Sequence, residues 1–283
     1  MNHNLELESN IKPYYFREKL FIRLTLIWVV VISLGIISAY LFHFPSRIPL
    51  GRLNFYTYGL FMVSGIVLGL WYAENLLKEE QQYELYRNLP NLLLVGFVGA
   101  RLYHVIFNLS YYSKHLFEIF LVWHGGLSIW GILIAIWVYM FLAKLDSKIV
   151  GILSLALPLG QAMGRLGNAA NYELLGIPMT GKLAMKVPEI FRPMGDSSYV
   201  PWFLLEQLTL LLIFVIMRWF VVKYSYSGWQ LFSLYIFLYA ISRLFLEPLR
   251  IPSDMIFGIS VTYFTAGILI PFSAIVFWRK HYE

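Results

Sequence analysis

The stretch VGILSLALPLGQAMGRLGNAANYELLGIP, residues 150–178, joins a helix-length apolar run to polar side chains placed between glycines. The polar side chains are those of Arg165, Asn168, Asn171 and Glu173. Charged groups are costly inside a membrane, so charged residues in or beside a membrane span are candidates for function. The stretch therefore predicts a membrane-spanning helix whose end carries a functional site.

The composition indicates the same class of protein along the whole chain. Of the 283 residues, 59% are hydrophobic and only 13% are charged, whereas soluble domains carry about a quarter charged residues. A span needs roughly 20 apolar residues, and suitable runs occur at 21–43, 56–74, 90–109, 127–143, 149–164, 202–222, 229–247 and 259–278. The sequence predicts an all-α, polytopic membrane helix bundle of about eight transmembrane helices.

The basic residues predict how this bundle is oriented. They cluster before the first span, after the last span and in short loops, as Lys12, Arg17, Lys19, Arg23, Lys144, Lys148, Arg218, Lys223, Arg279 and Lys280. Eight spans place all of these on one side, which the positive-inside rule makes cytoplasmic. Both termini are then cytoplasmic and the segment 165–200 faces outward. The net charge of +6 needs no nucleic-acid partner, because much of it is this orientation signal.

Some classes of chemistry are excluded by residue content. The chain has no cysteine, so disulfides, thiolate metal sites and a cysteine nucleophile of its own are ruled out. It also has no H-E-x-x-H metal-binding spacing. No metal site and no cofactor are expected.

The polar end of the quoted stretch has the residue types of a phosphate site. Gly160 and Gly164 lie one helical turn apart, which permits close approach of another helix, and Gly167 leaves room beside Arg165 and Asn168. A guanidinium group beside amides matches phosphate oxygens in a two-pronged geometry. The alternative is that Arg165 caps the helix end and extends its charge to the membrane interface.

A second set of polar residues lies in LYAISRLFLEPLR, residues 238–250. Tyr239, Arg243 and Glu247 recur every four residues and Arg250 follows three later, so all four fall within roughly 80° of one helix face. The alternative is a self-neutralising Arg243–Glu247 pair. The second arginine, which has no acid of its own, favours an anionic ligand.

A third set lies in GARLYHVIFN, residues 99–108, where Arg101, His104 and Asn108 share one helix face. A lone histidine is more often a structural group than a catalyst. WHGGLSIWG, residues 123–131, adds His124 before the next span. An interfacial turn anchored by Trp123 explains this stretch as well, so the turn alone predicts no function.

Taken together, these motifs resemble the prolipoprotein diacylglyceryl transferase family. Residues 164–176 are similar to the family signature G-R-x-G-N-F-x-N-x-E-x-x-G, with Ala169 where phenylalanine is usual. Weaker matches follow in the family's order: Tyr58-Gly59-Leu60, Gly99-Ala100-Arg101, Trp123-His124-Gly125-Gly126, and Tyr239 with Arg243 through Arg250. The resemblance covers roughly residues 45–280. It divides the chain into a basic cytoplasmic tail with an extra transmembrane helix, 1–44, and a diacylglyceryl transferase membrane domain, 45–283.

The resemblance implies transfer of the diacylglyceryl group of phosphatidylglycerol to the lipobox cysteine of a prolipoprotein, with release of glycerol phosphate. This is the first step of bacterial lipoprotein maturation, and the resemblance places it at the outer face of the cytoplasmic membrane. The implied partners are phosphatidylglycerol, prolipoprotein signal peptides and the lipid bilayer. Negative charge grows on the departing phosphate, so Arg165 and Arg243 are expected to stabilise the transition state.

The other expected roles follow from the same chemistry. Tyr239 and His104 are further catalytic candidates. The expected phosphatidylglycerol-binding residues beside Arg165 are Asn168, Asn171, Arg101, Arg250 and Tyr58. Structural support of the site is expected from Glu173, Glu247, Gly164 and Gly167.

One departure from the family concerns the proton of the substrate thiol. Many members carry histidine in a G-G-x-x-x-H-G pattern, and Trp130 stands at that position here. Tryptophan cannot accept the proton, so the base is either another histidine, His104 before His124, or there is no dedicated base. Our hypothesis is that no single histidine is essential.

Two other functions fit arginine-lined spans. One is a transporter or flippase for an anionic lipid or solute, which would often show two related halves; no such repeat is visible in the sequence. The other is a non-catalytic relative that only binds lipid, which Trp130 keeps open.

Overall fold

The computed structural model of the chain describes residues 31, 34, 47–50, 53–122, 125–224, 226–251, 255–256 and 258–278. Its longer helices are α2 (Thr57–Glu74), α3 (Glu79–Phe107), α5 (Ile129–Leu142), α6 (Ser147–Asn171), α7 (Trp202–Lys223), α8 (Gly228–Leu246) and α9 (Val261–Trp278). Each coincides with one apolar run predicted from the sequence, and α3 and α6 extend well beyond theirs. The predicted all-α bundle is confirmed. The predicted first span, 21–43, lies outside the described residues apart from positions 31 and 34.

Within the described part of the chain, five helices are long and apolar enough to cross a membrane: α3, α6, α7, α8 and α9. Helix α5 is apolar but has only 14 residues. The chain is therefore an integral membrane protein built from helices. That α2 and α5 also cross the membrane stays a prediction.

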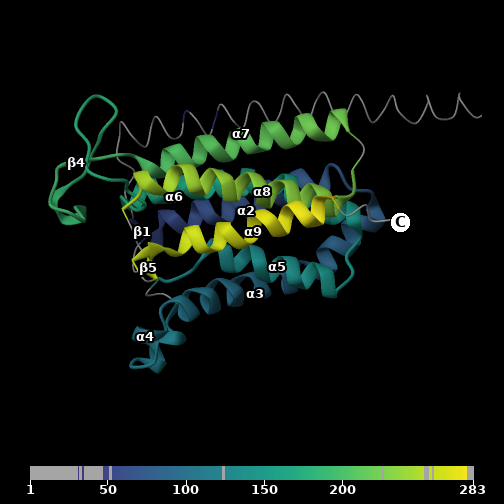
Figure 1. Cartoon of the computed structure of the whole chain (residues 1–283), viewed down its shortest axis with the longest axis horizontal. Helices are drawn as coiled ribbons and strands as arrows, with labels where there is room; N and C mark the ends of the chain where they lie inside the picture. Colours follow the sequence, from purple (N-terminus) through teal and green to yellow (C-terminus); the bar gives the residue numbers. More distant parts are fainter. Residues whose placement is uncertain are drawn as a thin grey trace, which may run out of the picture.

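Helix α6 lies at the centre of the bundle and packs against α2, α7 and α8 (Figure 1). Helix α9 packs on α8, and α3 packs with α5. Glycines allow two of these approaches: a Cβ atom on Gly65 of α2 would lie 2.5 Å from the carbonyl oxygen of Gly160, and one on Gly99 of α3 would meet the main chain of Gly131. The close approach expected at Gly160 is thus present.

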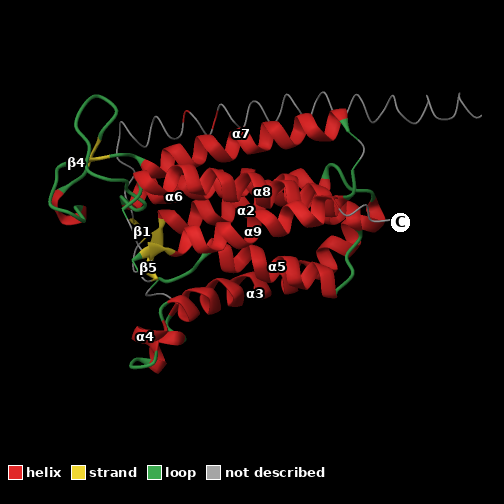
Figure 2. Ribbon diagram, viewed as in Figure 1, coloured by secondary structure: helices red, strands yellow, loops and turns green. Residues whose placement is uncertain are grey.

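Short elements collect at one end of the bundle, away from the C-terminal end of α9 (Figures 1 and 2). They are three antiparallel hairpins, β1 (Arg47–Leu50) with β2 (Leu53–Tyr56), β3 (Met185–Lys186) with β4 (Ser198–Tyr199), and β5 (Met255–Ile256) with β6 (Ile259–Ser260). The short helices are α4 (Leu109–Tyr112), η1 (Leu116–Ile119), η3 (Glu189–Phe191) and η4 (Glu247–Leu249).

The chain leaving α6 ties three helix ends together at this end of the bundle. Tyr172 adopts a left-handed conformation, with φ of 55°, and ends α6. The Gly176 amide then donates to the Val200 carbonyl at 2.8 Å, and the Ile177 amide donates to the Leu249 carbonyl at 3.0 Å. A Cβ atom on Gly176 would collide with the Leu249 carbonyl, so only glycine permits this join. As a result, the end of α6, the start of α7 and the end of α8 lie at one place.

Candidate functional site

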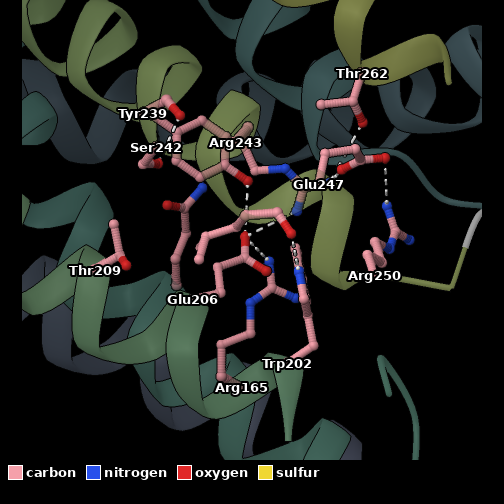
Figure 3. Close-up of polar contacts among 12 residues, drawn as sticks. Arg165, Trp202, Glu206, Thr209, Tyr239, Ser242, Arg243, Glu247, Arg250 and Thr262 are labelled. Carbon is pink, nitrogen blue, oxygen red and sulfur yellow. Dashed lines mark hydrogen bonds and ion pairs between the residues drawn. The ribbon is translucent and has the colours of Figure 1, made fainter. Parts of the chain in front are cut away.

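Five charged side chains form a continuous series of ion pairs where α6, α7 and α8 meet (Figure 3). Arg165 Nη2 lies 2.7 Å from Glu206 Oε1, and Arg243 Nη1 lies 3.3 Å from the same oxygen. Arg243 Nη2 lies 3.1 Å from Glu247 Oε2, and Arg250 Nη1 lies 3.9 Å from Glu247 Oε1. We call these five residues the arginine–glutamate chain.

The centre of this chain is buried. Relative exposure is 4% for Arg243, 6% for Glu247 and 1% for Glu206. Buried ions are strongly destabilising when left unpaired and are tolerated when they have close partners and further hydrogen bonds. Ser260 supplies one such bond from its hydroxyl to Glu247 Oε1. The arrangement holds two guanidinium groups, those of Arg165 and Arg243, against one carboxylate oxygen.

Glu206 is the residue that the sequence reasoning missed. Its Oε1 also accepts a hydrogen bond from the Tyr239 hydroxyl at 3.0 Å, so one oxygen has three donors. Residues 202–222 form an apolar run in which Glu206 is the only acid. A carboxylate inside a membrane span is costly enough to mark a functional site, and that signal could have identified it.

Trp202 fixes the planes of two arginines. Its side chain is fully buried and its indole nitrogen donates to the Leu246 carbonyl at 2.8 Å. The guanidinium carbon of Arg243 lies 4.6 Å from the ring centroid and that of Arg250 lies 5.3 Å from it, which is within cation–π range. Burial of the Arg250 guanidinium group lowers its pKa, and the neighbouring positive charge of Arg243 lowers that pKa further.

The two amides of the sequence motif extend the site from Arg165. Arg165 Nη1 donates to Asn168 Oδ1 at 3.1 Å. Asn168 Nδ2 donates to one carboxylate oxygen of Glu173 at 3.3 Å, and Asn171 Nδ2 donates to the other at 3.1 Å. Glu173 was expected to give structural support to the site. Its hydrogen bonds to the described residues go to the two amides, and its support reaches Arg165 through Asn168.

Two glycines of α6, Gly164 and Gly167, face helix α2, which carries Tyr58. The space expected beside Gly167 is occupied by Tyr58, because a Cβ atom on Gly167 would lie 2.7 Å from Tyr58 Cδ2 and 3.0 Å from its Cα. At Gly164 a Cβ atom would make only an ordinary contact, 3.7 Å from Met62 Sδ. Gly167 therefore admits Tyr58 next to the Arg165 turn.

Arg101 belongs to a different set of contacts. It is 6% exposed and its guanidinium group donates to four main-chain carbonyls, those of Glu118, Ile119, Gly125 and Gly126. In the part of the chain that the structure describes, no ion pair joins it to the arginine–glutamate chain. This geometry holds residues 118–119 and 125–126 against α3, and lipid binding by Arg101 stays a prediction.

The two candidate bases and Trp130 are placed as follows. The ring of His104 lies beside Gly126 and edge-on to Tyr112, with centroids 5.9 Å apart. Trp130 contacts the site directly, with its ring centroid 5.2 Å from that of Tyr239. His124 lies outside the described residues.

A family model and individual relatives, compared with this chain, indicate the same protein family. Residues 45–279 match the family described as prolipoprotein diacylglyceryl transferase. The chain is 36% identical over 224 residues to a phosphatidylglycerol–prolipoprotein diacylglyceryl transferase of Fervidobacterium nodosum, which covers 73% of this chain and 74% of the relative. It is 32% identical over 253 residues to the protein of that name from Streptococcus equi subsp. zooepidemicus, covering 84% of this chain and 95% of the relative.

Proposed function

The chain belongs to the prolipoprotein diacylglyceryl transferase family, and we infer from this membership that it is a membrane enzyme that transfers the diacylglyceryl group of phosphatidylglycerol to a prolipoprotein. We propose that the acceptor atom is the thiol sulfur of the lipobox cysteine. The chain has no cysteine of its own, so the nucleophile comes from the substrate protein.

The observation that supports the placement of this reaction is the pairing of Arg165 and Arg243 with one carboxylate oxygen, at 2.7 and 3.3 Å. Two guanidinium groups that share one oxygen are close enough to bind one phosphate group together. Arginine suits this task because its planar fork of N–H donors matches phosphate oxygens.

In the proposed reaction, these two arginines stabilise the negative charge that develops on the leaving phosphate. The cysteine thiol loses its proton to solvent, its sulfur forms a bond to the glycerol carbon, and the bond between that carbon and the phosphate oxygen breaks. The electron pair of the broken bond stays on the phosphate oxygen, so negative charge grows there. Fixed positive donors that bind this charge most tightly in the transition state lower the barrier. Arg165 and Arg243 are held ready for this by Glu206, Glu247 and Trp202.

Other side chains around the two arginines are proposed to orient the arginines or the substrates through hydrogen bonds and packing. Asn168 hydrogen-bonds Arg165 directly, whereas Tyr239 hydrogen-bonds Glu206, the carboxylate that pairs with both phosphate-binding arginines. Trp130 packs on Tyr239 and cannot accept the thiol proton. We retain the hypothesis that no single histidine is essential.

We further propose that the reaction takes place at the outer face of the bacterial cytoplasmic membrane, with both termini in the cytoplasm. The distribution of lysine and arginine supports this orientation. The arginine–glutamate chain lies at the end of α8 and the start of α7, the ends that this orientation places outward.

Membership of an enzyme family favours transfer over the transporter, flippase and lipid-binding alternatives. The test is to incubate the purified protein with phosphatidylglycerol vesicles and a lipobox peptide. Diacylglyceryl-modified peptide and released glycerol phosphate, both lost in Arg165→Ala, are the expected products. Lipid movement without peptide modification would instead support the transporter, and binding without either would support a non-catalytic relative.

A further inference from the structure

Three buried polar atoms of the arginine–glutamate chain have no hydrogen-bond partner among the described residues. They are Oε2 of Glu206 and the Nε atoms of Arg165 and Arg243. Buried polar atoms in proteins are nearly always paired, and the exceptions need an explanation such as a ligand. Glu206 stands out because its side chain is 1% exposed and its other oxygen already accepts three donors.

Two of the three atoms are hydrogen-bond donors and one is an acceptor, and this restricts the chemistry of a ligand that could pair with them. Each Nε–H is a donor and suits an anionic oxygen, whereas an ionised carboxylate oxygen is an acceptor only. A bare phosphate would pair with the two donors and be repelled by Glu206 Oε2. A ligand that satisfies all three atoms must carry an anionic oxygen and, within a few bonds of it, a hydrogen-bond donor.

The headgroup of phosphatidylglycerol has this combination, because its phosphate is esterified to a glycerol with two hydroxyl groups. We propose that Glu206 is a specificity-determining residue: its Oε2 accepts a hydrogen bond from a headgroup hydroxyl while Arg165 and Arg243 bind the phosphate. The inference rests on the proposed function and adds to it the means by which one lipid headgroup is selected.

The charge of the arginine–glutamate chain distinguishes a hydroxyl from an ammonium as the donor. Three guanidinium groups and two carboxylates are linked by the ion pairs of these five described residues, so the arginine–glutamate chain itself carries a net charge of +1. Phosphatidylglycerol carries one negative charge and compensates it. A zwitterionic ethanolamine headgroup would leave it uncompensated and bring an ammonium group next to guanidinium groups.

The test compares two lipids that differ only in the headgroup hydroxyls. Phosphatidylglycerol and phosphatidylpropanol, with the same acyl chains, have the same phosphodiester charge, and phosphatidylpropanol has no hydroxyl. Each is presented in phosphatidylcholine vesicles, and transfer to a lipobox peptide is measured as kcat/KM. A hydrogen bond to a buried charged group predicts that the wild-type protein prefers phosphatidylglycerol by about 10- to 100-fold.

In Glu206→Gln we expect the preference for phosphatidylglycerol over phosphatidylpropanol to fall several-fold, because a neutral amide replaces the charged acceptor. This expectation concerns the ratio of the two kcat/KM values and holds even if total activity is reduced. The ratio is measured within one preparation, so it does not depend on the amount of folded protein. Glu247→Gln is the matched control, because both Glu247 oxygens already have partners, Arg243 and Ser260. It should slow transfer from both lipids by a similar factor and keep the wild-type ratio.

Equal use of the two lipids by the wild-type protein would overturn the inference, and so would a wild-type ratio in Glu206→Gln. If Glu206→Gln does not fold, Glu206→Asp makes the same comparison, because it withdraws the carboxylate by one methylene and should also reduce the preference. A wild-type protein that transfers from neither lipid would contradict the proposed function, which is a different result.

Discussion

Replacing Arg165 separates the geometry of its side chain from its charge. Arg165 bonds Asn168 through one terminal nitrogen at 3.1 Å and Glu206 through the other at 2.7 Å. Arg165→Ala removes both contacts, whereas Arg165→Lys keeps the charge on a single ammonium group. The side chain is 14% exposed, against 5% for that of Arg243, so its replacement should disturb folding less than replacement of Arg243.

The expected loss of activity follows from the number of contacts removed. Removal of one preorganised donor to a developing negative charge costs about 2.7–4 kcal/mol, a hundred- to thousandfold in rate, so Arg165→Ala should lose at least a hundredfold. Arg165→Lys should also fail substantially, because one ammonium cannot reproduce the two-pronged geometry. Glu206 keeps Arg243 and Tyr239 as partners in both variants, so both should fold.

The assay is the rate of peptide modification at saturating phosphatidylglycerol, with membrane level and thermal unfolding measured on the same samples. Arg192→Ala is the control, since Arg192 lies outside the arginine–glutamate chain and donates its Nε to the Val187 carbonyl. We expect it to keep most of the activity. Near-normal turnover by Arg165→Ala at matched membrane levels would remove Arg165 from the mechanism.

Three further predictions concern the rest of the chain. Deleting residues 1–44 should leave transfer largely intact, because the family match begins at residue 45; an inserted but inactive truncation would show that the first segment contributes to the site. His104→Ala, His124→Ala and the double variant should each retain a transfer rate within roughly a hundredfold of the wild-type rate. A larger loss in one single variant would identify that histidine as the base if the rate recovers as the pH is raised toward the thiol pKa of about 8.5. Gly167→Val should push a side chain into Tyr58 and cost about 1–3 kcal/mol of stability, measured as a lower unfolding temperature; an unchanged temperature would contradict the close packing.

The arrangement of the site suggests why so apolar a chain tolerates its ions. Each of the two buried carboxylates, Glu206 and Glu247, is shared between two arginines. This sharing lowers the cost of burial while leaving positive charge for a substrate. In the function that we propose, the same groups also bind the anionic substrate.

The sequence alone determined the features that depend on local geometry. Apolar runs of span length predicted the seven longer helices, because each run must bury its main-chain polar groups in its own hydrogen bonds. The four-residue spacing on α8 placed Tyr239, Arg243 and Glu247 on one face, because the helical pitch fixes that relation, and the Arg243–Glu247 contact at 3.1 Å follows from it. The polar motif after Gly164 likewise predicted a candidate site at the end of α6, and that function stays a prediction.

Only the tertiary structure decided which charges meet. Glu206 is 41 residues from Arg165 and 33 from Tyr239, and no spacing rule relates positions on different helices. Their contact depends on how α6, α7 and α8 pack and on the glycine-permitted join after α6. Packing also separated Arg101 from the site, since its helix pairs with α5 and its guanidinium group bonds main-chain carbonyls of residues 118–119 and 125–126. Helix pitch is a property of a single segment, whereas the partners of a buried charge are set by the helices that surround it.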